Sequence, residues 1–137
     1  MSNNTHKPKV LILCTGNSCR SQMAEGITRH LYGHICDVFS AGINPSSVNK
    51  SAITVMKEIN IDISNHVSKS MSAIKEHSFN LVITVCDNAK ESCPVLMGIH
   101  KKLHWCFEDP VGLNKEKFCE VRDLIYQKFK SELGAYF

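Results

Sequence analysis

The stretch Val10–Ser21, VLILCTGNSCRS, decides the fold. Its first five residues form a continuous apolar run, which is typical of a strand buried on both faces in a parallel sheet. The residues from Thr15 to Ser18 have turn chemistry, and Ser21 is placed to cap a helix that ends near Gly33. We therefore expect a buried strand, a tight loop and a helix in immediate succession.

The rest of the chain continues this alternation of strands and helices. Apolar patterns predict strands over residues 36–41, 81–86 and 103–107, and helices over residues 52–59, 71–77 and 115–133. The last helix shows one apolar face, made of Phe118, Val121, Leu124, Ile125, Phe129 and Leu133. Such alternation predicts an α/β fold: a three-layer α/β/α sandwich around a four-stranded parallel sheet, in one domain over residues 1–137.

The composition is that of a globular protein. The 137 residues are 43% hydrophobic and 21% charged, which excludes a disordered or fibrous chain. The net charge of +3 is too small to indicate nucleic acid as a partner, although it suits an anionic substrate. Residues 1–8 are polar, and no apolar run approaches the roughly 20 residues that span a membrane. We expect a cytoplasmic monomer with no membrane partner.

Seven cysteines stand out in such a chain. Structural disulfides are rare in the cytoplasm, so these thiols need another explanation, namely burial, metal binding or redox chemistry. Cys14 and Cys86 end predicted buried strands, and ligands of α/β folds bind beyond the carboxyl ends of the strands. The segment around Asp109 follows a third strand at the same edge, so we expect these three residues to converge.

The loop that follows Cys14 is suited to a tetrahedral oxyanion. Its small residues allow successive backbone N–H groups to turn inward as an anion-binding nest, beside the positive end of the next helix. The Arg20 guanidinium can grip an oxyanion in bidentate fashion. In this positive field the pKa of the Cys14 thiol should fall below its usual value of about 8.5, which favours a nucleophilic thiolate. The predicted oxyanion-binding residues are Thr15, Gly16, Asn17, Ser18, Cys19 and Arg20.

Two further residues could take part in chemistry at this edge. Cys93 lies in a polar loop that could carry it toward Cys86 for thiol–disulfide exchange, although a chance exposed thiol is the alternative. Asp109 could reach the oxyanion as a proton donor, with Glu108 as the competing carboxylate and a plain turn residue as the alternative.

The remaining cysteines are expected to pack rather than react. Cys19 lies inside the loop in a structural role, Cys36 and Cys106 lie in strand patterns, and Cys119 lies in the last helix. His100 and His104 have a spacing that suits metal ligands on a helix, but His104 falls in a predicted strand, so no metal site is expected.

The segment Cys14–Gly26, CTGNSCRSQMAEG, resembles the signature of the thioredoxin-coupled arsenate reductases, which share the fold of the low-molecular-weight protein tyrosine phosphatases. The likeness covers nearly the whole chain, through SAG at 40–42, IDISNH at 61–66 and HW at 104–105. The loop and the Asp109-Pro110 motif are shared with the phosphatases, whereas the added pair Cys86 and Cys93 points to the reductases.

The resemblance implies a three-cysteine relay that reduces arsenate to arsenite in arsenic detoxification. Cys14 attacks arsenic, Ser21 holds its thiolate, and Asp109 assists departure of an oxygen as water. Cys86 then attacks Cys14 and releases arsenite, and Cys93 attacks Cys86. Thioredoxin recycles the Cys86–Cys93 disulfide, so no bound cofactor is needed. Phosphate or sulfate would mimic the substrate.

This chain departs from its relatives at two places. Some members bind potassium at positions that correspond to Asn17, Glu25, Val67 and Lys69 here. Val67 brings no side-chain oxygen and Lys69 brings a positive charge, so we expect no potassium site. Cys106 stands where a glycine is usual in these relatives.

Two other functions are compatible with the same residues. A low-molecular-weight protein tyrosine phosphatase would use Cys14, Arg20 and Asp109 and leave the other cysteines idle, and weak phosphatase activity is expected in either case. A redox-sensing or oxyanion-binding protein without turnover would need neither Asp109 nor an exchangeable Cys93.

Overall fold

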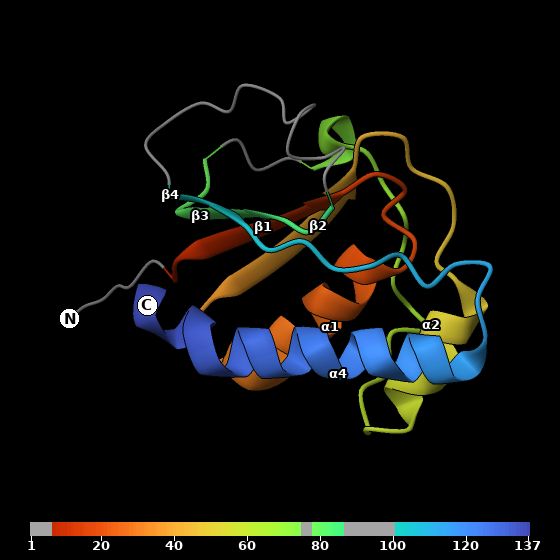
Figure 1. Cartoon of the computed structure of the whole chain (residues 1–137). Helices are drawn as coiled ribbons and strands as arrows, with labels where there is room; N and C mark the ends of the chain where they lie inside the picture. Colours follow the sequence, from red (N-terminus) through yellow and green to blue (C-terminus); the bar gives the residue numbers. More distant parts are fainter. Residues whose placement is uncertain (1–6, 75–77, 87–100) are drawn as a thin grey trace.

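The structure, a computed structural model, describes residues 7–74, 78–86 and 101–137. Its strands form one parallel sheet in the order β2-β1-β3-β4, with β1 at Lys9–Cys14, β2 at Asp37–Gly42, β3 at Leu81–Thr84 and β4 at Lys101–His104. The helices are α1 at Arg20–Tyr32, α2 at Lys50–Lys57 and α4 at Lys115–Glu132, with 3-10 turns η1 at Met71–Ala73 and η2 at Leu133–Tyr136. The predicted α/β fold with a four-stranded parallel sheet is confirmed (Figure 1).

The two continuous apolar runs form the centre of this sheet. Every residue of Val10–Cys14 and of Leu81–Thr84 is buried. Leu11 pairs with Phe39 of β2 on one side and with Val82 of β3 on the other. Because a central parallel strand is covered on both faces, its sequence is apolar throughout rather than alternating, which explains why these two strands were predictable.

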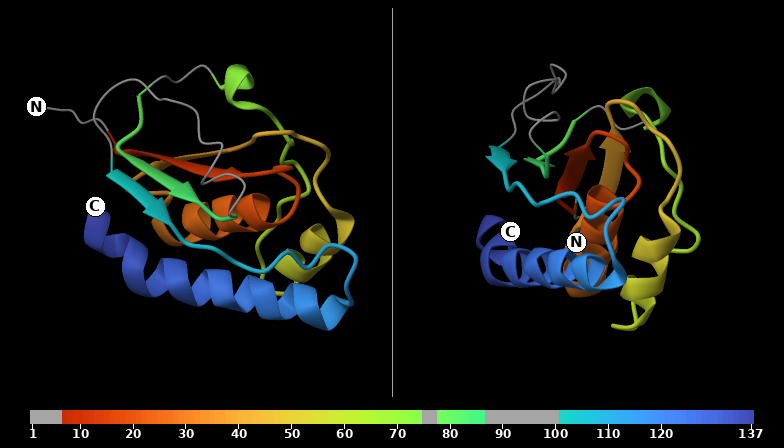
Figure 2. Two further views of the ribbon diagram at one scale, coloured as in Figure 1. Left: turned by 45° about the horizontal axis from the view of Figure 1, so that its top comes forward. Right: turned by 45° about the vertical axis from the view of Figure 1, so that its right-hand side comes forward.

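The three α-helices of the described residues lie on one face of the sheet (Figures 1 and 2). α1 is buried from Ser21 to Thr28, because it lies between the sheet and α4. A helical layer on the opposite face is not found within residues 7–74, 78–86 and 101–137. The third layer of the predicted sandwich therefore stays a prediction.

The predicted apolar face of α4 contains one error. Phe118, Val121, Ile125, Phe129 and Leu133 are buried, whereas Leu124 is 54% exposed. With 3.6 residues per turn, Leu124 lies off the stripe that the other five form. The stripe instead admits the polar residue Arg122, whose Nη1 donates to the Val55 carbonyl at 2.9 Å.

Element boundaries differ from the predicted ones near the site. α1 begins at Arg20, so Ser21 is a buried residue of the first turn and not the helix cap. β4 ends at His104, so Cys106 lies beyond the strand. Of the helix predicted over residues 71–77, the structure shows only the turn η1, and residues 75–77 lie outside the described ranges.

Within the described residues, no helix combines the length and apolar character needed to cross a membrane.

Candidate functional site

The oxyanion loop, residues 14–20 between β1 and α1, has its carbonyl groups bonded from outside. Four backbone N–H groups donate to them: Ile43 to Cys14 at 3.1 Å, Asn44 to Thr15 at 2.8 Å, Ser46 to Gly16 at 3.0 Å, and Asn49 to Ser18 at 2.8 Å. In a trans peptide the C=O of one residue and the N–H of the next point in opposite directions. Carbonyls held outward therefore turn the following N–H groups toward the inside of the loop, where an anion can accept them.

Asn17 holds the middle of the oxyanion loop in an unusual backbone shape. Its φ of 48° lies in the left-handed region, which Asn tolerates better than most residues. Its side-chain Nδ2 donates to Ser21 Oγ at 2.8 Å and to Ser40 Oγ at 3.0 Å. Its Oδ1 accepts from the Lys69 N–H at 2.9 Å. One fully buried amide thus ties the loop to α1, to β2 and to the segment before η1.

Gly42, at the end of β2, packs directly against the oxyanion loop, so position 42 has no room for a side chain. A Cβ at this position would lie 2.8 Å from the Thr15 carbonyl oxygen and 2.9 Å from the Asn17 nitrogen. Both are backbone atoms of the loop, so Gly42→Ala should displace the loop, destabilise the fold by about 1–3 kcal/mol and weaken phosphate binding. Urea unfolding and calorimetric phosphate titration measure the two effects.

Gly134→Ala is the matched control for Gly42→Ala. A Cβ at Gly134 meets nothing nearer than the Tyr32 hydroxyl at 3.3 Å. This variant should keep its phosphate affinity. Equal affinity in both variants would contradict the close approach.

Arg20 closes the oxyanion loop and holds the chain that follows β4. Its side chain is only 13% exposed. Nη1 donates to the Phe107 carbonyl at 3.0 Å, and Nη2 lies 3.7 Å from Asp109 Oδ2. Glu108, the competing carboxylate, instead has its Oε1 2.8 Å from Lys117 Nζ. The structure therefore brings Asp109, and not Glu108, to the arginine.

Two adjoining cavities open on this loop. The smaller, about 150 Å³, is lined by Cys14, Thr15, Gly16, Ser18, Cys19, Arg20, Asp109 and Val111. The larger, about 300 Å³, is lined by Thr15, Arg20, Cys86, Cys106, Phe107, Glu108 and Asp109. The two share Thr15, Arg20 and Asp109, so a ligand held by the loop lies next to the space that Cys86 and Cys106 line.

The predicted lowering of the Cys14 pKa is not what the structure shows. The hydrogen bond with the Cys86 thiol and the burial of the sulfur raise the pKa of Cys14 well above its usual range. The Arg20 guanidinium and the Thr15 N–H act in the opposite direction, but they are outweighed. The predicted convergence of Cys14 and Cys86 is confirmed, but the sequence does not reveal that their contact raises the pKa of Cys14. In the ligand-free arrangement the contact with Cys86 therefore favours the protonated form of Cys14.

Removing the Cys86 thiol should lower the pKa of Cys14. Cys86→Ala deletes the largest cause of the upward shift and leaves Arg20 and the Thr15 N–H in place. The rate of Cys14 alkylation by iodoacetamide, followed by peptide mass spectrometry, should therefore rise at lower pH than in the wild type. Cys36→Ala is the control, because it removes a buried thiol at the residue before β2. It should leave the pH dependence of Cys14 alkylation unchanged.

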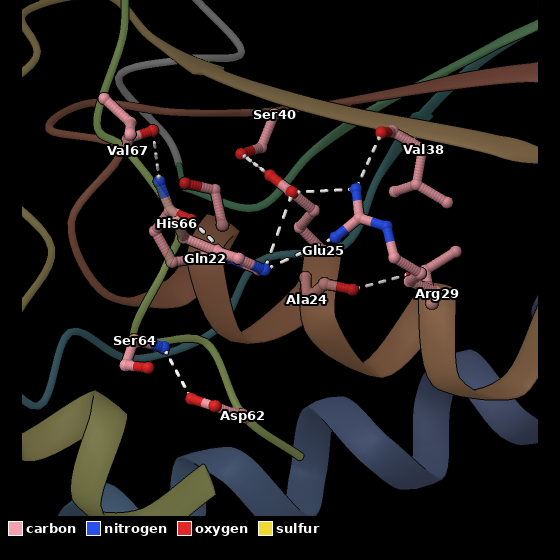
Figure 3. Close-up of polar contacts among 12 residues, drawn as sticks. Gln22, Ala24, Glu25, Arg29, Val38, Ser40, Asp62, Ser64, His66 and Val67 are labelled. Atoms are coloured by element: carbon pink, nitrogen blue, oxygen red, sulfur yellow. Dashed lines mark hydrogen bonds and ion pairs between the residues drawn. The ribbon is translucent and has the colours of Figure 1, made fainter. Parts of the chain in front are cut away.

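Glu25 is a buried carboxylate that contacts several polar side chains near the oxyanion loop (Figure 3). Its carboxylate accepts from Arg29 Nη2 at 2.9 Å and from the Ser40 hydroxyl. Lys69 Nζ lies 3.8 Å from Glu25 Oε1 and donates to the Val67 carbonyl at 3.2 Å. Because Ser40 also accepts from Asn17, the carboxylate is joined to the oxyanion loop through one hydroxyl.

Gln22 and His66 support the oxyanion loop, although neither residue was predicted to belong to the site. Gln22 Nε2 donates to the carbonyls of Asn17 at 3.0 Å and Val67 at 3.2 Å. With both amide protons used, Gln22 Oε1 is the acceptor for His66 Nδ1 at 2.9 Å (Figure 3). Burial lowers the pKa of His66, which favours the neutral ring. In the sequence, both residues lie in segments that resemble the arsenate reductases, and this was the only signal for them.

The other predicted residues are placed as follows. Cys19 and Cys36 are buried and Cys119 is half-buried, as expected. Burial raises the pKa of Cys19 to about 12, which fits a packing role. Cys106 was expected to pack, but it is exposed, because β4 ends before it.

Two predicted roles stay predictions. Ser21 Oγ accepts from Asn17, and its support of a Cys14 thiolate remains to be tested. Cys93 and His100 lie outside the described residues, so the exchange between Cys86 and Cys93 is not tested by the structure.

Comparison with known proteins identifies close relatives. Residues 9–134 match the family described as low molecular weight phosphotyrosine protein phosphatase. Arsenate reductase 2 of Staphylococcus saprophyticus is 48% identical over 124 residues, which cover 90% of this chain and 95% of that protein. The arsenate reductase of Staphylococcus aureus strain N315 is 46% identical over 127 residues, which cover 90% of this chain and 97% of that protein.

Solved structures agree with these matches. An arsenate reductase in a phosphate-binding state superposes with a TM-score of 0.78 at 31% identity, covering 95% of this chain and 99% of that one. The tyrosine phosphatase Wzb from Escherichia coli K30, in complex with sulphate, has a TM-score of 0.82 at 21% identity, covering 96% and 100%, and shares the fold.

Proposed function

Because this chain belongs to the low molecular weight phosphotyrosine protein phosphatase family, and its similar relatives include arsenate reductases, we propose that it reduces arsenate to arsenite. The observation that carries the proposal is the hydrogen-bonded pair of Cys14 and Cys86 beside an oxyanion loop. A phosphatase needs one nucleophilic thiol. A second thiol in contact with the first is what the removal of arsenic from sulfur requires.

The first step forms a bond between Cys14 and arsenic. Arsenate is held by the inward N–H groups of the oxyanion loop and by Arg20. The Cys14 proton passes to the bound arsenate dianion as sulfur attacks arsenic, which fits the raised pKa of the ligand-free thiol. Asp109, held beside Arg20, passes a proton to the departing oxygen, which leaves as water.

The second step transfers two electrons to arsenic. The Cys86 sulfur attacks Cys14, so the sulfur–arsenic bond breaks, the Cys14–Cys86 disulfide forms and arsenite leaves. Thr15 Oγ1 lies 3.2 Å from Cys86 Sγ and is placed to take part in orienting that sulfur. Cys93 then attacks Cys86, and thioredoxin reduces the Cys86–Cys93 disulfide in the cytoplasm. In the cell this reaction would serve resistance to arsenic. We expect the protein to act as a monomer.

No potassium ion is needed in this proposal. The Lys69 ammonium lies 3.8 Å from the Glu25 carboxylate and bonds the Val67 carbonyl. The Lys69 ammonium thus contacts residues at two of the four positions that correspond to potassium ligands, Glu25 and Val67, and this supports the expectation that no potassium ion binds. In this proposal the Cys86–Cys93 disulfide carries the electrons, and the reaction needs no bound cofactor.

Weak phosphatase activity accompanies the reductase activity in this proposal. Cys14, Arg20 and Asp109 form the set that a phosphatase needs, and the loop binds phosphate and arsenate by the same contacts. Hydrolysis of an aryl phosphate therefore does not distinguish the two functions.

Arsenite formation with thioredoxin, thioredoxin reductase and NADPH tests the function. The wild type should oxidise NADPH in proportion to arsenate. Cys93→Ser should still release one arsenite per chain in a single turnover, while its coupled turnover falls, because the Cys86–Cys93 disulfide that thioredoxin reduces cannot form. Undiminished coupled turnover in Cys93→Ser would remove Cys93 from the relay, and absence of arsenite with the wild type would refute arsenate reduction.

A further inference from the structure

The ends of three neighbouring strands each bring a cysteine to the site. Cys14 ends β1, Cys86 follows β3, and Cys106 follows β4, which is the order of these strands in the sheet. The reaction proposed above uses Cys14 and Cys86. Cys106 lines the same cavity as Cys86, and that reaction assigns it no role.

The pairing of β3 with β4 brings the segments that carry Cys86 and Cys106 to the same cavity. Thr84 pairs with His104, and their side chains meet, with Thr84 Oγ1 2.7 Å from His104 Nδ1. Each cysteine lies two residues after this pair, in a segment beyond the end of its strand.

The two segments stay paired beyond the strands. The Trp105 N–H donates to the Thr84 carbonyl at 2.9 Å, and the Phe107 N–H donates to the Val85 carbonyl at 3.2 Å. These two bonds hold the segment of Cys106 against that of Cys86, and a disulfide between the two residues requires a Cα–Cα spacing of about 4.4–6.8 Å.

The two cysteines differ in how well an external reductant can reach them. Cys14 and Cys86 are each 3% exposed, so a disulfide between them is shielded from a large dithiol protein. Cys106 is exposed. An exchange that moves the oxidised bond from Cys14–Cys86 to Cys86–Cys106 would bring one of its sulfurs to the surface.

Resting on the proposed arsenate reduction, we propose that Cys106 is a second resolving thiol of this enzyme. Its thiolate attacks Cys86 Sγ in the Cys14–Cys86 disulfide. The Cys86–Cys106 bond forms, the Cys14–Cys86 bond breaks, and Cys14 leaves as a thiolate that takes up the proton lost by Cys106. No electrons enter or leave in this exchange, and an external dithiol later reduces the new disulfide.

The segment that carries Cys106 is already held in place for this exchange. Arg20 Nη1 donates to the Phe107 carbonyl. The Phe107 N–H in turn donates to the Val85 carbonyl. The attacking thiol therefore starts from a position fixed to the sheet and to the oxyanion loop.

Disulfide mapping in a Cys93→Ser background tests the proposal. Cys93→Ser, Cys93→Ser/Cys106→Ser and the control Cys93→Ser/Cys119→Ser are treated with arsenate, quenched with acid and N-ethylmaleimide, and mapped by peptide mass spectrometry. Cys119 is the matched control, because it is a half-buried thiol on α4 outside both cavities. A parallel arm replaces arsenate by the thiol oxidant diamide, and arsenite is quantified in every arsenate sample.

We expect a Cys86–Cys106 linkage in Cys93→Ser and in the Cys119 control, and a Cys14–Cys86 linkage when Cys106 is replaced. Replacing Cys106 in the Cys93→Ser background should also abolish the turnover with thioredoxin that Cys93→Ser retains. Arsenite release with a persistent Cys14–Cys86 linkage in Cys93→Ser overturns the role of Cys106 and leaves arsenate reduction intact. Failure to release arsenite counts against the reductase function instead. In that case the samples treated with diamide still test the pairing of the two cysteines. Absence of the Cys86–Cys106 linkage in those samples refutes it.

Discussion

Cys14→Ser should abolish arsenite formation, with a loss in kcat of about 10⁴-fold or more. Serine lacks the sulfur that binds arsenic, and it cannot form the disulfide with Cys86 whose formation supplies the two electrons. The oxyanion loop keeps its shape, because its carbonyls are held by residues 43–49 and its centre by Asn17. Phosphate binding measured by calorimetry should therefore survive while arsenite, quantified after a single turnover, disappears.

Cys36→Ser is the control for this variant. Cys36 is 2% exposed and lies in front of β2, so the same chemical change is made at a buried thiol that lines neither cavity. Its arsenite yield should equal that of the wild type. Arsenite release by Cys14→Ser at the wild-type rate would show that another thiol is the nucleophile.

Arg20→Lys should lower kcat/KM for arsenate by about 10²- to 10³-fold. Lysine keeps the charge, but it has a single ammonium in place of the planar fork that binds two oxygens at once. It also gives up the Nη1 bond to the Phe107 carbonyl and the approach to Asp109, so the segment that carries Asp109 is released as well. Steady-state kinetics over arsenate concentration measure the effect.

Arg122→Lys provides the matched control, since it makes the same change on α4. Arg122 bonds the Val55 carbonyl and Glu58, so its loss should lower the melting temperature without changing kcat/KM below that temperature. Equal kcat/KM values for Arg20→Lys and Arg122→Lys would contradict the assignment of Arg20 to the oxyanion.

The parts of the fold that could be predicted are those with local causes. Val10–Cys14 and Leu81–Thr84 read as central strands because burial on both faces leaves an apolar run. The oxyanion loop could be predicted because a strand, small residues and Arg20 stand together in the sequence.

The parts that could not be predicted depend on contacts between distant segments. The ends of the strands predicted that Cys14 and Cys86 converge, although the two residues are 72 positions apart. They did not predict that a hydrogen bond between the two thiols raises the pKa of Cys14. Gln22 and His66 support Asn17 through a pairing between α1 and the segment before η1, which no periodicity reveals. Cys106 was misplaced because the apolar pattern ran past His104, where β4 ends.

The outward bonding of the loop carbonyls has a consequence for how the chain folds. The donors lie at residues 43–49 and at Ser68, so the loop acquires its shape only after segments about 30 to 50 residues apart have come together. The unfolded chain therefore has no anion site, and an oxyanion binds only the native state. By mass action, phosphate at a hundred times its dissociation constant should add about 2.7 kcal/mol to the free energy of unfolding. Substrate-like anions thus act as folding ligands for this enzyme.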